Sequence, residues 1–389
     1  MRDVLYEKGY IRGPFGSALK RREMKNEGIP VYEQQHAIYD TRIFRYYIDE
    51  NKFQELKRFQ VLPNDLIVSC SGTIGKTSLI RKNDESGIIS QALLILRSNP
   101  NIIHPKFLKY FLETNKGYNS LISSAGGSSQ VNIAKKQIIL DIPLVVPNLQ
   151  LQCKIIDFLD KITNKIQLLE QKYEKYQEFK KYLMQQIFTQ KLRFADFSDD
   201  WVECKFKDLG TVKSGVRFSN KYQGHVDLKY NVYKVSDMNL KGNEKIMNKS
   251  NNTVDEEILS EMGAKLIDVP SIIFAKVGEA IFLNRKRIAK PNFLIDNNMM
   301  AFSPNNAVKL EFMYYLSTTI NFGKYAQTGA LPSYNASDIY SIKCKIPSIE
   351  EQEKIVNILS LVDNKIDFCS NQIRDVLNFK KGLLQQMFV

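Results

Sequence analysis

One short run near the start of the chain carries residues that could bind a nucleotide phosphate. Gly72, Gly75 and Lys76 lie in the segment GTIGKTS, and a phosphate-binding loop uses glycines and a lysine of this kind, with its first glycine five residues before the second. That position is occupied by Cys70. The glycines therefore predict a turn between two strands, and no ATP site is expected.

No other set of residues has the spacing of a catalytic or metal site. The sequence contains neither the Asp/Asn-Pro-Pro-aromatic segment of amino-methyltransferases nor a glycine-rich cofactor loop after a strand. His36, His104 and His225 are far apart and have no cysteine or carboxylate at ligand spacing. The acidic run at 255–257 fits the first turn of a helix, where carboxylates are favourable. We therefore expect a protein that is not an enzyme and that holds no cofactor or metal.

The basic residues are concentrated in two stretches. The chain has 55 Lys+Arg against 42 Asp+Glu, a formal net charge of +13. Residues 1–146 and 204–346 each carry a net charge of +7, whereas the segments between and after them are nearly neutral or acidic. Two basic regions on one chain indicate a polyanion that is bound at two places. A generally basic solvated surface is the alternative.

A segment in the middle of the chain returns at its end, 200 residues later. Both copies place apolar residues three and four positions apart, which is the pattern of a long helix with heptad spacing. One heptad core position is lysine in both, Lys180 and Lys380. Each apolar stripe needs a partner of equal length to pack against, and the predicted partner is the other helical copy. The alternative is that each helix packs on its own globular domain. The matching residues include Pro147, Gln152, Lys154, Ile155 and Leu159 in the first copy and Pro347, Gln352, Lys354, Ile355 and Leu359 in the second.

Short apolar segments punctuated by turns precede each helix. Segments 61–80 and 266–284 both place a proline before a β-branched strand, then a glycine turn and a second strand. The predicted fold class is α/β (α+β): two similar globular domains separated by two long helices that form an antiparallel coiled coil, a pseudo-twofold tandem repeat. The predicted bounds are 1–146 and 204–346 for the globular domains, 147–190 and 347–389 for the helices, and 191–203 for a connector.

Taken together, these features resemble the DNA-specificity subunit of type I restriction-modification systems, over nearly the whole chain. The resemblance is carried by PNDLIVSCSGTIG with VPSIIFAKVGEA, by the loops that contain Asn132 and Asn335, and by the helix openings PNLQLQCKIIDFLDKI and PSIEEQEKIVNILSLVDNKI with their FKK endings. One departure is visible. A lead-in, LRFADFSDDWVECKFKDLG at 192–210, precedes the second domain, whereas its counterpart before the first domain is shortened or absent.

The resemblance implies a non-catalytic subunit with two target-recognition domains. Each domain would read one half of a split site on double-stranded DNA, and the helices would set the unread gap. The implied protein partners are two adenine-specific methyltransferase (modification) subunits, together with two restriction/translocase subunits in the full complex. Methylation would then be the work of the partner.

Direct readout of bases needs paired donors, such as arginine for guanine and asparagine or glutamine for adenine, with lysine and hydroxyl groups on phosphate. We therefore expect DNA contacts from basic, amide and hydroxyl residues of each domain. In the first domain these are Arg12, Lys20, Arg21, Arg22, Gln34, Gln35, Lys76, Ser129 and Gln130. In the second domain they are Arg217, Lys221, Lys234, Ser236, Lys276, Arg285, Arg287, Tyr334 and Asn335.

Two other classes of function remain open. One is an interaction scaffold whose basic domains bind acidic proteins, and the other is a nuclease with an unrecognised active site. The five cysteines are odd in number and form no CxxC pair, so reduced thiols are expected. No run reaches the apolar length of a membrane span, and the N-terminus has no apolar signal core. The expectation is a cytoplasmic protein with no membrane partner.

Overall fold

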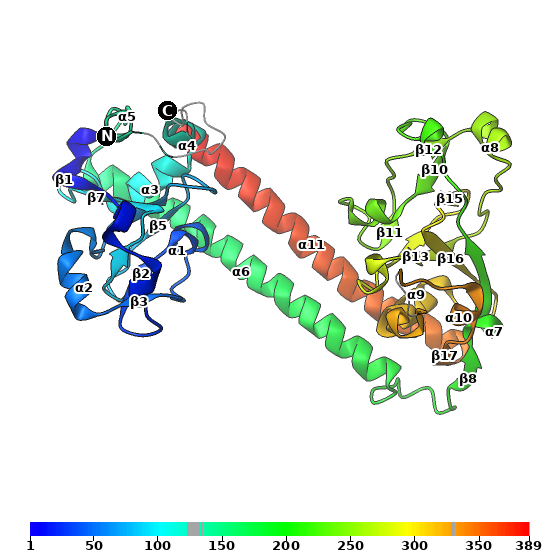
Figure 1. The fold of residues 1–389 in the computed structure, drawn as a ribbon. Coiled ribbons are helices and arrows are strands. Elements are labelled where there is room, and N and C mark those ends of the chain that lie inside the picture. The colour runs from blue at the N-terminus through cyan, green and yellow to red at the C-terminus, as the bar shows by residue number, and fades with distance from the viewer. Residues whose placement is uncertain (123–132, 134, 328–330, 389) are drawn as a thin grey trace. The chain divides into compact units, whose positions relative to one another are not determined.

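A computed structural model of the chain describes residues 1–122, 133, 135–327 and 331–388 (Figure 1). The chain divides into two compact units. Unit 1 consists of Met1–Gln171 and Cys369–Val389, and unit 2 is Lys172–Phe368. Each unit contains one globular domain, the beginning of one long helix and the end of the other.

The domain of unit 1 is built on an antiparallel sheet with the strand order β1-β7-β4-β5. A second sheet has the order β3-β2-β6. Strand β4 is buried at every position, which is why its sequence is apolar without alternation. The strands are β1 Leu5–Arg12, β2 Ile29–Tyr32, β3 Tyr47–Ile48, β4 Leu66–Ser69, β5 Thr77–Leu79, β6 Ile88–Ile89 and β7 Leu93–Ser98. The α-helices are α1 Gln34–Tyr39, α2 Glu50–Glu55, α3 Pro105–Glu113, α4 Asn115–Ile122 and α5 Lys136–Leu140.

The domain of unit 2 has a five-stranded sheet in the order β11-β14-β13-β16-β9 and two smaller sheets, β12-β10-β15 and β17-β8. Its central strand β13 is likewise buried throughout. The strands are β8 Val202–Lys205, β9 Gly210–Ser214, β10 Tyr230–Tyr233, β11 Ile246–Met247, β12 Thr253–Val254, β13 Ser271–Ala275, β14 Lys286–Ala289, β15 Leu294–Ile295, β16 Met299–Pro304 and β17 Lys343–Ile346. The α-helices are α7 Phe206–Leu209, α8 Glu256–Met262, α9 Leu310–Thr319 and α10 Ala336–Tyr340.

The two domains repeat each other's backbone contacts. Gly13 N–H donates to the Leu93 carbonyl at 3.0 Å, and Gly215 N–H donates to that of Met299 at 3.2 Å. Both positions require glycine: a Cβ atom on Gly13 would lie 2.0 Å from the Ser90 carbonyl oxygen, and one on Gly215 would lie 1.8 Å from that of Asp296. The tandem repeat therefore includes the globular domains as well as the helices.

The long helices are α6 Leu149–Phe188 and α11 Ile349–Met387. In unit 1, residues from the start of α6 and the end of α11 share one core, including Ile156, Leu159 and Leu384. In unit 2, the end of α6 and the start of α11 do the same, with Leu183 and Leu359 among the buried residues. Because each start is packed with the other helix's end, the helices run antiparallel, and the predicted fold class is confirmed. Both also pack on the domain of their unit.

The repeated glutamines near the helix starts explain part of the sequence repeat. Gln152 and Gln352 are both fully buried. The Gln152 side chain accepts from His104 N–H at 2.7 Å and donates to the Pro147 carbonyl at 2.8 Å. Gln352 accepts from Lys309 N–H at 2.9 Å and donates to the Pro347 carbonyl at 3.0 Å. Each glutamine therefore ties a long helix to the first turn of a domain helix, α3 or α9.

The lysine shared by the two heptad patterns has the same role in both units. Lys180 Nζ lies 2.5 Å from Asp363 Oδ1 and 5.5 Å from the ring centroid of Tyr315. Lys380 Nζ lies 3.8 Å from a Glu113 carboxylate oxygen and 5.3 Å from the ring centroid of Tyr110. Burial lowers the pKa of Lys380. Each lysine thus joins a long helix to an aromatic ring on the helix of its domain.

Candidate nucleic-acid interface

Three predicted DNA-contact residues of unit 1 converge on the turn between β4 and β5. Gln34, at the start of α1, donates through Nε2 to the Ser71 carbonyl and, at 3.4 Å, to that of Thr73. Lys76 is exposed, and its Nζ lies 5.9 Å from the Tyr118 ring centroid. Arg12 ends β1 beside Cys70: burial raises the pKa of that thiol to about 12, although the guanidinium opposes the shift. The turn site is defined as Arg12, Gln34 and Lys76.

The guanidinium of Arg12 is only partly satisfied within the described chain. Its Nη1 is buried and has no hydrogen-bond partner among the residues that the structure describes. Its carbon lies 5.5 Å from the Phe15 ring centroid, where the cation is favourable. A buried donor without a partner costs free energy, so an incoming acceptor at this atom would be stabilising.

The other predicted residues of unit 1 lie apart from that turn. Lys20, Arg21 and Arg22 are exposed, the latter two on the short 3-10 helix Arg21–Glu23. Gln35 donates to the Ile43 carbonyl at 3.4 Å. Ser129, Gln130 and the loop residue Asn132 lie outside the described residues.

In unit 2, four predicted residues gather around the 3-10 helix η6, Val235–Asn239. Lys234 precedes it and donates to the Gln223 side chain at 2.7 Å, and Ser236 is exposed on it. Arg285 donates to the Asn239 side chain, and Arg287 donates to the Met238 carbonyl at 3.3 Å. Burial lowers the pKa of Arg287. The η6 site is defined as Lys234, Ser236, Arg285 and Arg287.

The turn site and the η6 site occupy corresponding places in the two domains. α1 follows strand β2, and η6 follows strand β10. Strands β2 and β10 are equivalent because the last residue of each accepts the same backbone hydrogen bond. The Tyr32 carbonyl at the end of β2 accepts from Ser90 N–H at 2.8 Å, and the Tyr233 carbonyl at the end of β10 accepts from Asp296 N–H at 3.0 Å. The repeat therefore places donor-rich side chains at the same point of each fold.

The remaining predicted residues of unit 2 have mixed positions. Arg217 is exposed, and Lys221 is exposed and lies 3.2 Å from a Glu261 carboxylate oxygen. Lys276 is half-buried, at the end of β13. Asn335 is exposed and caps α10 by accepting from Asp338 N–H at 3.0 Å.

Tyr334 is placed differently from our expectation. Its side chain is only 3% exposed, and its ring centroid lies 6.4 Å from that of Phe274 in the core. The ring packs inward because a residue of this size and apolarity gains more from burial than from solvent. In this conformation the ring is therefore not available to a DNA surface.

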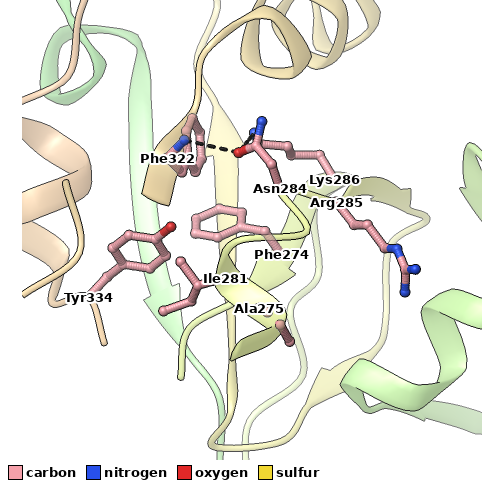
Figure 2. A pocket seen from close by; sticks show the side chains of 9 residues that line it. Phe274, Ala275, Ile281, Asn284, Arg285, Lys286, Phe322 and Tyr334 are labelled. Carbon is pink, nitrogen blue, oxygen red and sulfur yellow. Dashed lines mark hydrogen bonds between the residues drawn. The ribbon is translucent and has the colours of Figure 1, made fainter. Parts of the chain in front are cut away.

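Sequence reasoning missed Lys286, which lies between Arg285 and Arg287. Lys286 is 2% exposed and borders a small cavity of about 10 Å³, room for one water molecule. Figure 2 shows its side chain directed toward Asn284 and Phe322, whereas Arg285 points away. Alternation along a strand sends neighbouring side chains to opposite faces, and this was the signal that could have identified the inward lysine.

The Lys286 ammonium has neutral partners in place of a carboxylate. Its Nζ donates to the Asn284 side chain at 2.5 Å and to the Ile320 carbonyl at 2.9 Å, and it lies 4.0 Å from the Phe322 ring centroid. Ile320 caps the end of α9, where a cation is favoured by the helix dipole. Burial nevertheless lowers the pKa of Lys286 to about 7.

We expect this lysine to make stability depend on pH. In the unfolded chain the lysine has its ordinary pKa of about 10.4 and stays protonated up to a pH near that value. Between pH 7 and pH 10 the unfolded chain therefore binds more protons than the folded chain. The free energy of unfolding rises with pH in this range. From pH 7 to pH 9, the free energy of unfolding should rise by about 2 kcal/mol more in the wild type than in Lys286→Met. Urea unfolding of both proteins at the two pH values measures this difference.

Methionine is a suitable replacement because the two oxygens that accept from Lys286 each keep another hydrogen-bond donor when the ammonium is removed. Asn284 Oδ1 also accepts from Phe322 N–H at 2.9 Å, and the Ile320 carbonyl also accepts from the Asn284 side-chain amide at 3.1 Å. Equal pH dependence in the two proteins would show that Lys286 stays protonated when buried.

Within the described ranges, no group of three or more His, Cys, Asp or Glu side chains is arranged to hold a metal ion. No helix in those same ranges is long and apolar enough to cross a membrane. What the described chain does present is two corresponding sets of arginine, lysine, amide and hydroxyl donors on two repeated domains. Two basic domains with such donor sets are suited to holding a polyanion at two places.

The chain belongs to the type I restriction-modification DNA specificity family, because the model described as "Type I restriction modification DNA specificity domain" matches residues 16–177 and 198–378. The type I restriction enzyme MjaVIII specificity subunit of Methanocaldococcus jannaschii is 22% identical over 412 residues, which cover 95% of this chain and 89% of that relative. The putative MjaX specificity subunit of the same organism is 24% identical over 359 residues, which cover 87% of this chain and 80% of that relative.

Two solved structures share the fold. The type I restriction-modification S subunit from M. genitalium aligns with a TM-score of 0.56 and 17% identity over 100% of this chain and 94% of that chain. A chain from a study of complex assembly and conformational transition of the type I R-M system aligns with a TM-score of 0.57 and 13% identity, over 84% of this chain and 82% of that chain.

Proposed function

We propose that this chain is the DNA-specificity subunit of a type I restriction-modification complex. Residues 1–146 and 204–346 act as target-recognition domains, each reading one half of a bipartite DNA site. Residues 147–190 and 347–389 form the helices that set the spacer and dock the methyltransferase subunits, with 191–203 as the connector. Two modification subunits and two restriction/translocase subunits complete the assembly. The observation that carries the proposal is the correspondence between the turn site and the η6 site.

The chemistry of the two sites suits direct readout of base edges. Arginine can donate two hydrogen bonds to guanine, and glutamine can donate to and accept from adenine. Arg12 and Gln34 in the turn site and Arg285 in the η6 site supply such groups. The exposed Lys20, Arg21, Arg22 and Arg217 supply charge for phosphates, which position the protein without carrying sequence information.

The first test concerns the activity of the subunit. The chain alone is expected to transfer no methyl group from S-adenosylmethionine to DNA, whereas the chain mixed with its modification partner methylates adenines at one bipartite sequence. Methyl incorporation with and without each component, followed by mapping of the methylated positions, measures this. Methylation by the chain alone would contradict a non-catalytic role, DNA cleavage with magnesium would favour a nuclease, and binding without sequence preference would favour a scaffold.

Single substitutions should assign one half-site to each domain. Gln34→Ala is expected to relax selectivity in one half and Arg285→Ala in the other, each weakening binding of the intact site by about 10- to 100-fold because a paired base contact contributes about 1–3 kcal/mol. Competition binding with sites mutated in either half measures both effects. Lys345→Ala, at an exposed position of β17, is the control and should lower affinity equally for all sequences or not at all. Loss of selectivity in both halves from one substitution would contradict separate readers.

The repeated phenylalanines of the helices are the best candidates for docking the modification subunits. Phe179 and Phe379 are 48% and 56% exposed although both are large and apolar, and exposed apolar groups on a soluble protein often mark an interaction surface. The double substitution Phe179→Ala/Phe379→Ala is expected to weaken modification-subunit binding at least about 10-fold, while DNA binding by the subunit is unchanged. Tyr182→Ala is the matched control, since Tyr182 is equally exposed but has Gly382 as its counterpart. A control variant that binds as weakly as the double variant would contradict this assignment.

A further inference from the structure

Two cysteines of unit 2 lie directly opposite each other on neighbouring strands. Strand β8 belongs to the lead-in at 192–210 and pairs antiparallel with β17, and Figure 1 shows the two strands side by side. In this register Cys204 faces Cys344. Both thiols are free, and their sulfur atoms are 3.6 Å apart. The thiol pair is defined as Cys204 and Cys344, and its two sulfur atoms are close enough to react with each other.

The backbone around the thiol pair already has the spacing that a disulfide needs. Directly opposite residues of an antiparallel ladder have Cα atoms about 4.5–5.5 Å apart, and disulfides join Cα atoms that are about 4.4–6.8 Å apart. Bonded sulfur atoms are about 2.05 Å apart, so the observed 3.6 Å must shorten by about 1.5 Å. Rotation of the two side chains can supply this movement, and the pairing of the strands does not have to change.

The thiol pair lies on the inner face of the two strands and is still within reach of solvent. One position along, Glu203 and Lys345 are exposed and form an ion pair of 3.1 Å. Neighbouring side chains of a strand alternate between its faces, so both thiols point to the opposite side, where they pack on the core of unit 2. Each cysteine nevertheless remains partly exposed. A small oxidant can therefore reach the sulfur atoms.

No other thiol in unit 2 competes with this pair. The remaining three cysteines, Cys70, Cys153 and Cys369, all belong to unit 1. Cys70 and Cys369 are buried, whereas Cys153 is exposed. In the repeat, the position of Cys344 is occupied by Leu144 in unit 1. Oxidation of the thiol pair is therefore expected to join these two residues and no others.

The local environment indicates which thiol reacts first. Burial raises the pKa of both Cys204 and Cys344. For Cys204 the hydrogen bond from Cys344 opposes that rise, and the thiolate is the reactive form of a cysteine. Cys204 is therefore the first nucleophile, and Cys344 is the second. The raised pKa of both thiols also keeps the pair reduced until an oxidant is in excess.

We propose that the thiol pair is an oxidation site for hydrogen peroxide, and that its disulfide covalently fixes the lead-in to the domain of unit 2. Cys204 attacks one peroxide oxygen: an S–O bond forms, the O–O bond breaks and the other oxygen leaves as water. Cys344 then attacks the Cys204 sulfur, so that the S–S bond forms, the S–O bond breaks and a second water leaves. The two thiols lose two electrons and two protons, and one hydrogen peroxide is reduced to two water molecules.

The disulfide acts on the junction between the domain and helix α6. Cys204 and Cys344 are 140 positions apart, and a crosslink stabilises more when it closes a longer loop of the unfolded chain. Trp201, directly before β8, is 5% exposed, and its ring centroid lies 6.3 Å from that of Phe188 at the end of α6 and 6.1 Å from that of Phe312. Fixing β8 to β17 therefore also holds this tryptophan in place. Unit 2 is expected to open less often in the oxidised protein.

The experiment compares the reduced full chain with the same protein after treatment with hydrogen peroxide and blocking of the remaining thiols. Peptide mapping without reductant is expected to find residues 204 and 344 joined within one molecule, and dithiothreitol should reverse the bond. Hydrogen exchange of the slowest amides of unit 2 should become at least about 10-fold slower on oxidation. Cys204→Ser and Cys344→Ser are the matched controls, and peroxide should produce neither the bond nor the slower exchange in either variant.

Four outcomes would overturn the proposal. The first is oxidation of Cys204 and Cys344 to separate sulfinic acids, and the second is a disulfide to Cys153 or between two molecules in place of the expected bond. The third is an unreacted pair under conditions that oxidise Cys153. The fourth is a complete bond between residues 204 and 344 with no change in the exchange of unit 2. Because the wild type is compared in its two redox states, these outcomes are decisive even where a serine variant fails to fold. None of them depends on DNA or methylation, so they are separate from the proposed function.

Discussion

Replacing Trp201 by alanine is expected to lower the free energy of unfolding of unit 2 by about 3–5 kcal/mol. The ring is buried between Phe188 and Phe312, and its removal leaves a cavity at the junction of helix and domain. A loss of this size is a large part of the total stability of a typical domain, about 5–15 kcal/mol. Urea unfolding followed by circular dichroism measures the loss, and hydrogen exchange should locate it in unit 2, with unit 1 unaffected.

Trp201→Phe is the matched control for this experiment. The indole Nε1 is buried without a hydrogen-bond partner among the described residues, so phenylalanine keeps most of the aromatic packing and removes an unsatisfied donor. We expect it to cost clearly less than alanine does, because the smaller loss of volume leaves a smaller cavity. If alanine and phenylalanine cost the same, aromatic packing at this position would not be what stabilises unit 2.

Inserting one heptad into both long helices is expected to lengthen the spacer of the recognised DNA site by about three base pairs. Seven residues add about 10 Å at 1.5 Å per residue, and base pairs are about 3.4 Å apart. The insertions belong between Gln171 and Lys172 in α6 and between Phe368 and Cys369 in α11, because the two compact units divide there and the contacts inside each unit are preserved. Mapping of methylated adenines measures the new spacer, and both half-sites should be unchanged.

A heptad inserted into α6 alone provides the control. The helices would then differ in length between the units, and we expect methylation of any bipartite site to be lost while each domain still folds. Active methylation at the original spacer after the double insertion would show that the helices do not set the distance. This experiment rests on the proposed function, whereas the Trp201 experiment does not.

Much of the architecture could be predicted from periodic features of the sequence. The helices were predictable because apolar residues at intervals of three and four persist for about forty positions in both copies. The repeat itself pointed to equivalent packing, and the buried Gln152 and Gln352 show why these polar residues recur: each satisfies backbone groups that no apolar side chain could.

The candidate site was less predictable, because residue type does not determine the direction of a side chain. Lys286 lies between two predicted DNA contacts and Tyr334 was itself predicted to be one, yet both side chains lie inward. The sequence also contained no sign that Arg12 and Gln34 meet at the turn near Cys70, since contacts between distant segments depend on the packing of the whole sheet. Such contacts arise only when the strands pair.

The sequence by itself determined that the chain is a tandem repeat of an α/β domain and a long helix, with positive charge concentrated in the domains, because these properties depend on local periodicity and composition. Only the tertiary structure decided which donors gather at the turn and η6 sites, which lysine is buried, and that Trp201 packs between Phe188 and Phe312 in unit 2. The physical reason is that burial, pairing and cavities depend on groups brought together from far apart in the chain, and each can be recognised only once its neighbours are in place.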